Sequence, residues 1–120
     1  MLDEVISKVK DVAGVDVVYF LKNNEIVKEH RNTSSDNYLT QVQNILKSNS
    51  SLNSISSNLF SDDFHTCSFL NEAGLMIVSK FSNQESLYMI IVAGENEPVD
   101  LLSLLKICKE IRLSFQNVKI

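Results

Sequence analysis

The sequence is poor in the residues from which most recognisable binding sites are built. Its 120 residues include only three glycines, one proline and no tryptophan. The glycines, Gly14, Gly74 and Gly94, are too far apart for a phosphate-binding loop or a dinucleotide-binding fingerprint, because both need closely spaced glycines. We therefore expect that the chain binds no nucleotide itself and holds no cofactor.

Cysteine and histidine are also scarce, with two of each. Cys67 and Cys108 lie far apart in apolar surroundings, which is typical of reduced, buried thiols. His65 and Cys67 fall on one face of a predicted strand, but zinc usually needs three or four ligands and no second pair exists in the sequence. A serine or cysteine nucleophile would need a histidine and an orienting acid beside it, and no such constellation is indicated. We expect no metal site, no catalytic residue and no enzymatic activity.

An excess of basic residues is absent as well. The net charge of −4 and the pI near 5.1 argue against nucleic-acid binding and leave no polybasic patch for an anionic membrane. No apolar run has the length of a signal peptide or a membrane span, so a cytoplasmic protein without membrane insertion is expected. With 44% hydrophobic residues, the chain has enough apolar mass for one core, and we predict a single domain over residues 1–120.

Hydrophobic periodicity predicts eight elements in the order α-β-β-α-β-β-β-α. The strand before residue 94 is apolar on both faces, which indicates a central strand covered by helices on both sides. The predicted elements are a helix over Leu2–Ala13, strands Val17–Leu21 and Ile26–His30, a long helix Asn37–Leu59, strands Phe64–Leu70, Leu75–Phe81 and Leu87–Ala93, and a closing helix from Leu101 to Val118.

The predicted helix Asn37–Leu59 is unusual because Lys47 is its single charged residue. A helix that faces water normally carries Lys, Glu and Arg on its outer side. Small uncharged side chains, by contrast, let another backbone approach closely and cost little to desolvate when hydrogen-bonded. A kink would fall in the run Asn49–Ser51, because serine and asparagine are mediocre helix formers. The candidate interface residues on this helix are Asn37, Thr40, Gln41, Asn44, Lys47, Ser48, Ser51 and Ile55.

The strand Phe64–Leu70 is the second candidate contact region. It contains no lysine or proline to discourage pairing with another chain, whereas Ile26–His30 becomes charged toward its end. Alternate residues of a strand share a face, so Phe64, Thr66 and Ser68 lie on one side and complete the candidate interface.

The order and pattern of these elements resemble the roadblock family of dynein-light-chain-like domains. The resemblance spans nearly the whole chain and includes the uncharged second helix and the Leu-rich closing helix. It is carried further by the opening segment Val9–Val18, the turn Lys22–Glu25, the hairpin at Gly74 and the strand Leu87–Ala93. The chain departs from the family at Asn23 and Asn24, where members often have glycine, although asparagine tolerates the left-handed conformation.

The resemblance implies an α+β fold: a five-stranded antiparallel sheet with the first and last helices on one face and the long second helix on the other. Such domains form homodimers or heterodimers through their second helices and one edge strand, here Phe64–Leu70. They bind Ras-like small GTPases, and some relatives stimulate GTP hydrolysis. The implied function is a non-enzymatic dimeric regulator or scaffold whose partners are itself or a paralogous roadblock-like chain and a Ras-like small GTPase. A purely structural dimerisation adaptor and a GAF-like small-molecule sensor remain as alternatives.

Overall fold

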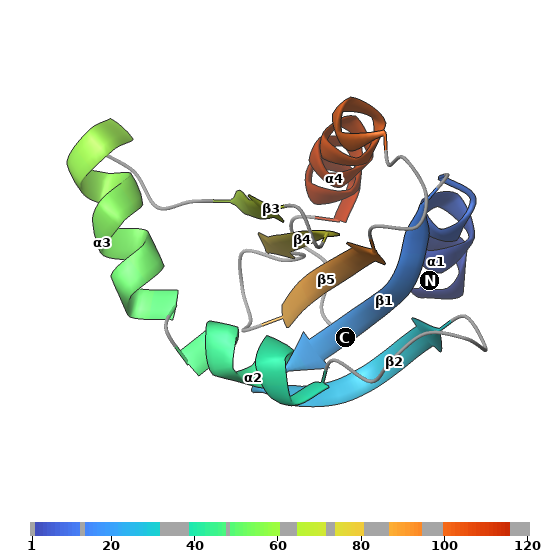
Figure 1. Ribbon diagram of the computed structural model, residues 1–120, viewed down its shortest axis with the longest axis horizontal. Coiled ribbons are helices and arrows are strands. Elements are labelled where there is room, and N and C mark those ends of the chain that lie inside the picture. The colour runs from blue at the N-terminus through green and yellow to red at the C-terminus, as the bar shows by residue number, and fades with distance from the viewer. Residues whose placement is uncertain are drawn as a thin grey trace.

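The protein is described by a computed structural model over residues 2–12, 14–31, 39–47, 49–60, 65–71, 74–80, 87–94 and 100–115. The described elements follow the predicted order of helices and strands, except that two helices stand where one long helix is predicted (Figure 1). They are α1 (Leu2–Lys10), β1 (Val15–Lys22), β2 (Glu25–Arg31), α2 (Leu39–Lys47), α3 (Asn49–Phe60), β3 (Thr66–Asn71), β4 (Gly74–Lys80), β5 (Leu87–Gly94) and α4 (Leu101–Phe115).

The five strands form one antiparallel sheet in the order β2-β1-β5-β4-β3. The predicted α+β fold with a five-stranded antiparallel sheet is therefore confirmed. The two central strands, β1 and β5, are buried almost throughout, which explains their continuous apolar runs. β3 and β2 form the two edges, so the strand that the resemblance places at an edge does lie there.

Helices cover both faces of the sheet. One face packs against α1 and α4 through a cluster that includes Val9, Phe20, Met89 and Leu104. The other face packs against α2, where Val42 joins a cluster of sheet residues. The first and last helices thus share one face and the second helix takes the other, as the resemblance implies (Figure 1).

The segment predicted as one long helix forms two helices, α2 and α3, rather than one. α2 ends at Lys47, α3 begins at Asn49, and the two helices run in different directions (Figure 1), next to the Ser/Asn-rich run in which the sequence places a kink. Polar side chains that compete for backbone hydrogen bonds make this a weak point in a helix. As a result α3 extends away from the sheet, beyond β3 (Figure 1).

The β1–β2 hairpin turns over Asn23 and Asn24, which have φ values of 53° and 65°. Two successive positive φ values in a two-residue loop are those of a type I′ turn, and asparagine adopts them more readily than most residues. The prediction that this turn forms without glycine is therefore confirmed. The Asn24 side-chain oxygen is buried and accepts no hydrogen bond from the described residues.

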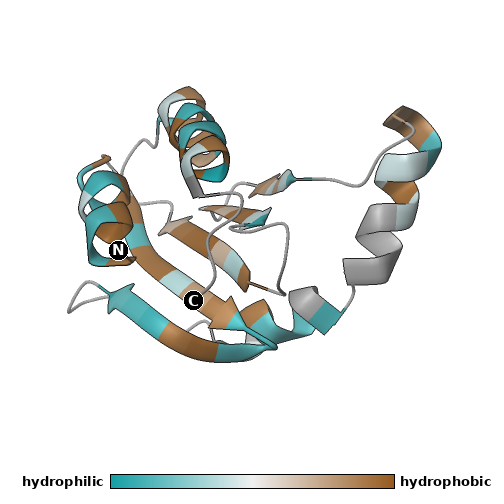
Figure 2. Ribbon diagram, turned by 180° about the vertical axis from the view of Figure 1, so that it is seen from behind, coloured by the Kyte–Doolittle hydropathy of each residue, from teal (hydrophilic) through white to brown (hydrophobic). Residues whose placement is uncertain are grey.

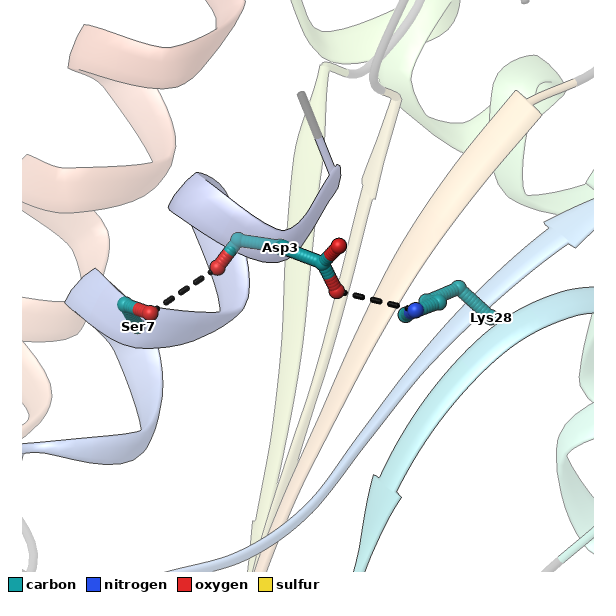
Figure 3. Close-up of polar contacts among 3 residues, drawn as sticks. All are labelled: Asp3, Ser7 and Lys28. Carbon is teal, nitrogen blue, oxygen red and sulfur yellow. Dashed lines mark hydrogen bonds and ion pairs between the residues drawn. The ribbon is translucent and has the colours of Figure 1, made fainter.

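An ion pair links α1 to the edge strand β2. Lys28 Nζ lies 2.9 Å from Asp3 Oδ1, and Ser7 Oγ donates a hydrogen bond to the Asp3 carbonyl (Figure 3). The hydrogen bond from Lys28 holds the pKa of Asp3 below its usual value. Both side chains are well exposed, so this pair adds little to stability and mainly positions α1 against the sheet.

A short chain of polar groups runs from β3 into the core. The hydroxyls of Thr66 and Ser79 lie 3.1 Å apart, and Ser79 is almost fully buried. The Ser79 hydroxyl also lies near the buried Cys108 thiol on α4. Burial raises the pKa of the Cys108 thiol to about 11, against a smaller lowering by the Ser79 hydroxyl. The bond to Thr66 provides a partner for the buried Ser79 hydroxyl and links β3 to β4.

Stability should fall in alkaline solution because of Cys108. The thiol ionises near its ordinary value of 9.0 when the chain is unfolded and only near 11 when it is folded. The contribution of the protonated Cys108 thiol to the free energy of unfolding is thus fully present below pH 9. As the pH rises toward 11, this contribution falls by roughly 2–3 kcal/mol in total. Chemical denaturation at pH 8 and at about pH 10.5 should show this fall in the wild type and a smaller one in Cys108→Ala. Equal falls in both proteins would contradict the assignment.

Replacing Asn24 with glycine should stabilise the hairpin. Glycine takes positive φ values without steric cost. The substitution also removes the buried side-chain amide oxygen of Asn24, which accepts no hydrogen bond from a described residue. We expect the free energy of unfolding to rise by about 0.5–1 kcal/mol. The matched control is Asn23→Gly, which changes the same turn at an exposed side chain and should gain less. A loss of stability in Asn24→Gly would mean that its side chain supports the turn.

Candidate interaction surface

The candidate surface is built on α2, which is fixed to the sheet at two points. The Val42 side chain is fully buried against the sheet. Gln43 Nε2 donates a 3.0 Å hydrogen bond to the Asn24 carbonyl oxygen in the β1–β2 turn. One apolar and one polar anchor on neighbouring residues fix the rotation of the helix about its axis, and this determines which side faces outward.

The outward side of α2 carries Thr40, Asn44 and Lys47, all exposed. These residues are spaced by four and three positions, so they form one stripe opposite Val42. Gln41 lies on the same helix, but its side chain is outside the described set, as is Ser48 altogether. Of the predicted polar stripe, Thr40 and Asn44 are the positions on α2 whose side chains are described, and both are exposed.

α3 presents large apolar side chains to solvent. Leu59 and Phe60 are 69% and 76% exposed, and Ile55, one turn before Leu59, is 58% exposed. The hydrophobic far end of this helix stands apart from the rest of the chain (Figure 2). Ser51 lies in the first turn of α3, and its side chain is outside the described set. An amphipathic helix normally buries such residues, so α3 lacks a cover within the described part of the chain.

The edge strand β3 adds a second exposed group. It pairs with β4 on one side, and no described strand pairs with its other side. Phe69 and Leu70 are exposed, as is Ser68. A strand edge with free backbone groups and apolar side chains favours pairing with another chain.

The structure separates the predicted interface residues into distinct places. Thr66 is half-buried, and its hydroxyl shares a hydrogen bond with Ser79 on the neighbouring strand β4. Ser68, which lies on the same face of β3, is exposed. Asn37 and Phe64 lie outside the described residues. Ile55 lies on α3, beyond the break, and so does not continue the straight stripe of α2 that one helix would have given.

On α3 and β3, four exposed apolar residues were not among the sequence-based candidates: Leu59, Phe60, Phe69 and Leu70. Each lies in an apolar pattern that fits a core position as well as a surface position. Only the direction of α3 and the place of β3 at the sheet edge distinguish the two cases. The polar outer stripe could be found from the sequence because it contrasts with an apolar stripe on the same helix.

The same surface offers little acid–base chemistry. Burial raises the pKa of the Cys67 thiol, which keeps it protonated near neutral pH. Among the described residues, no group of three or more His, Cys, Asp and Glu side chains could hold a metal ion. Within the same residues, no helix is both long and apolar enough to cross a membrane.

Similarity to known proteins lies in the fold rather than in the sequence. No family model matches the chain, and no curated protein matches it by sequence. Solved structures do match. An MglB structure with a tetrameric arrangement has a TM-score of 0.74 at 11% identity, over 93% of this chain and 82% of its own. The gliding protein MglB from Thermus thermophilus has a TM-score of 0.70 at 12% identity, over 91% and 81%.

A third match bears on the family resemblance. A Roadblock/LC7 domain from Streptomyces avermitilis aligns with a TM-score of 0.60 at 14% identity, over 91% of this chain and 92% of its own. The chain has a roadblock-like fold. The resemblance inferred from element order is therefore confirmed for the fold. Among the described residues of this roadblock-like fold, α2, α3 and the edge strand β3 carry the exposed surface described above.

Proposed function

We propose that residues 1–120 form a single roadblock-like domain that acts in the cytoplasm as a non-enzymatic, dimeric regulator or scaffold and binds a Ras-like small GTPase. The observation that carries this proposal is the uncovered apolar side of α3 and β3 on a roadblock-like fold. Soluble monomers rarely expose so many large apolar side chains in neighbouring elements.

A second copy of the chain, or a paralogous roadblock-like chain, is the cover that fits this surface. Between Leu39 and Phe60 the only charged residue is Lys47. A two-fold axis brings the same patch of both copies together, so a nearly uncharged patch avoids the like-charge repulsion that self-association otherwise creates. The free edge of β3 can pair with its symmetry mate and extend the sheet across the dimer.

A Ras-like GTPase is supported by the family resemblance and by the fold that the chain shares with MglB. Dimerisation would double the outer stripe of α2 into one platform, and a standard interface buries roughly 800 Å² per partner. The contact residues proposed on it are Gln41, Asn44, Lys47, Ser48 and Ser51. The chain offers no identifiable arginine finger, so any stimulation of hydrolysis would come from repositioning the GTPase's own groups.

The dimer is tested by placing charge on its proposed interface. Asn44 and Ile55 are exposed on α2 and α3, and changing both to glutamate would bring four carboxylates together across the two-fold axis. Analytical ultracentrifugation should then report a monomer, while the wild type sediments as a dimer. Lys8→Glu is the control, because it alters charge equally on α1, which covers the opposite face of the sheet.

Hydrogen exchange of the backbone amides is a second test of the proposed dimer interface. If β3 pairs across the dimer, its amides should exchange slowly in the wild type and faster in the Asn44→Glu/Ile55→Glu variant. A wild type that is monomeric at micromolar concentration would show that the dimer proposal is wrong. So would rapid exchange along β3 in a dimeric wild type.

Binding to the GTPase is tested by calorimetry with small GTPases from the same genome, loaded with GDP or a GTP analogue. We expect binding that clearly favours one nucleotide state, because a regulator shifts a switch only through its differential affinity for the two states. Lys47→Glu should weaken this binding by about tenfold, and because Lys47 lies on the same stripe as Asn44, ultracentrifugation of the variant separates a loss of GTPase contact from a loss of the dimer. If the chain dimerises but binds no GTPase in either state, the structural adaptor becomes the better assignment.

A further inference from the structure

A second exposed seam lies on the closing helix α4, on the other face of the sheet from α2. Leu102 and Leu113 are 80% and 53% exposed, and Lys106 and Lys109 between them are also exposed. α4 packs on the core through Leu104, Cys108 and Ile111. At about 100° per residue, the four exposed residues fall within roughly 60° of one another, opposite this buried side. The side of α4 farthest from the core is therefore formed by Leu102, Lys106, Lys109 and Leu113.

This arrangement differs from that of an ordinary solvated helix. The outermost line of such a helix carries charged residues, and leucine belongs on the inner side. Here two leucines occupy the outermost line, at steps of four, three and four residues with the lysines between them. These steps are those of a heptad seam, the pattern by which one helix receives the side chains of another. The seam is about 16 Å long, with one leucine layer at each end of a lysine pair.

The charge of the seam determines what can occupy it. α4 carries three cations, Lys106, Lys109 and Arg112, and one anion, Glu110, within a chain whose net charge is −4. Neither lysine of the seam forms an ion pair with a described residue. In an antiparallel pair of α4 helices from two copies, Lys106 of one copy would lie opposite Lys109 of the other. Like charges at facing seam positions are unfavourable, so a second copy is a poor occupant.

We propose that the Leu102–Lys106–Lys109–Leu113 seam is a docking site for an amphipathic helix of a different protein, one with two carboxylates between two apolar residues. The steps of four, three and four read the same in both directions, so such a helix fits in parallel or antiparallel orientation. Its apolar residues cover Leu102 and Leu113, and its Asp or Glu side chains pair with the lysines. This proposal does not rest on the proposed function, because the seam and the α2–α3 surface lie on opposite layers of the fold.

The test uses the full chain and two synthetic helical peptides. Both carry leucines at the ends of the same seam spacing, and the central pair is Glu-Glu in one peptide and Lys-Lys in the other. The Glu peptide should shift the amide NMR signals of residues 102–113 and bind at least about tenfold more tightly than the Lys peptide. The Lys106→Glu/Lys109→Glu variant should reverse this preference. Leu102→Ala/Leu113→Ala should weaken binding of the Glu peptide by about tenfold or more.

A charge-matched control separates the seam from general electrostatics. Lys8→Glu/Lys10→Glu on α1 changes the net charge by the same amount and should leave the binding of the Glu peptide unchanged. Equal affinity for both peptides, or signal shifts outside α4, would overturn the proposal. Binding to phosphatidylserine vesicles that depends on the same leucines and lysines, with no binding of the Glu peptide, would also overturn it and assign the seam to a membrane surface.

Discussion

The constraint on which the rest of the structure depends is that the two central strands are apolar on both faces. Tyr19, Phe20 and Leu21 on β1 and Ile90 and Ile91 on β5 have no exposed surface. Because successive residues of a strand point to opposite faces, such strands are stable only between two helical layers. α1 and α4 supply one layer, and α2 supplies the other. The two layers are unequal, since one has two helices over the sheet and the other has α2 with α3 directed away from it.

The order of elements could be predicted from the sequence because each depends on a local pattern. The continuous apolar run Leu87–Ala93 permits only a buried strand of its length, and β5 has nearly those bounds. Asn23 and Asn24 were sufficient to predict a tight turn, since few other residues accept two positive φ values. The break between α2 and α3 was only indicated, as a possible kink. Its direction depends on what the helix packs against, and a helical pattern in the sequence carries no information about that.

The candidate surface also includes some residues that a local sequence pattern predicts and others that depend on how the elements pack. The polar stripe predicted from helical periodicity includes Thr40 and Asn44, and both side chains are exposed. Leu59 and Phe60 could not be assigned to the surface in this way, because an apolar residue in a helix is normally a core residue. The hydrogen bond between the Thr66 and Ser79 hydroxyls could not be predicted either, because it depends on the register of the β3–β4 hairpin, which pairs these two residues directly. The sequence does not fix a register until the turn length is known.

The distribution of charge is the reason for proposing different roles for the two exposed surfaces. A patch that meets its own copy across a two-fold axis repeats every charge it carries, so it must be nearly neutral, and α2 and α3 together carry only Lys47. The seam on α4 carries two lysines at its centre and is therefore unsuited to its own copy but suited to an acidic partner. Because the two surfaces lie on opposite layers, use of one leaves the other free. A dimer formed through α2, α3 and β3 would present two α4 seams, and two linked sites bind a divalent partner far more tightly than either site alone.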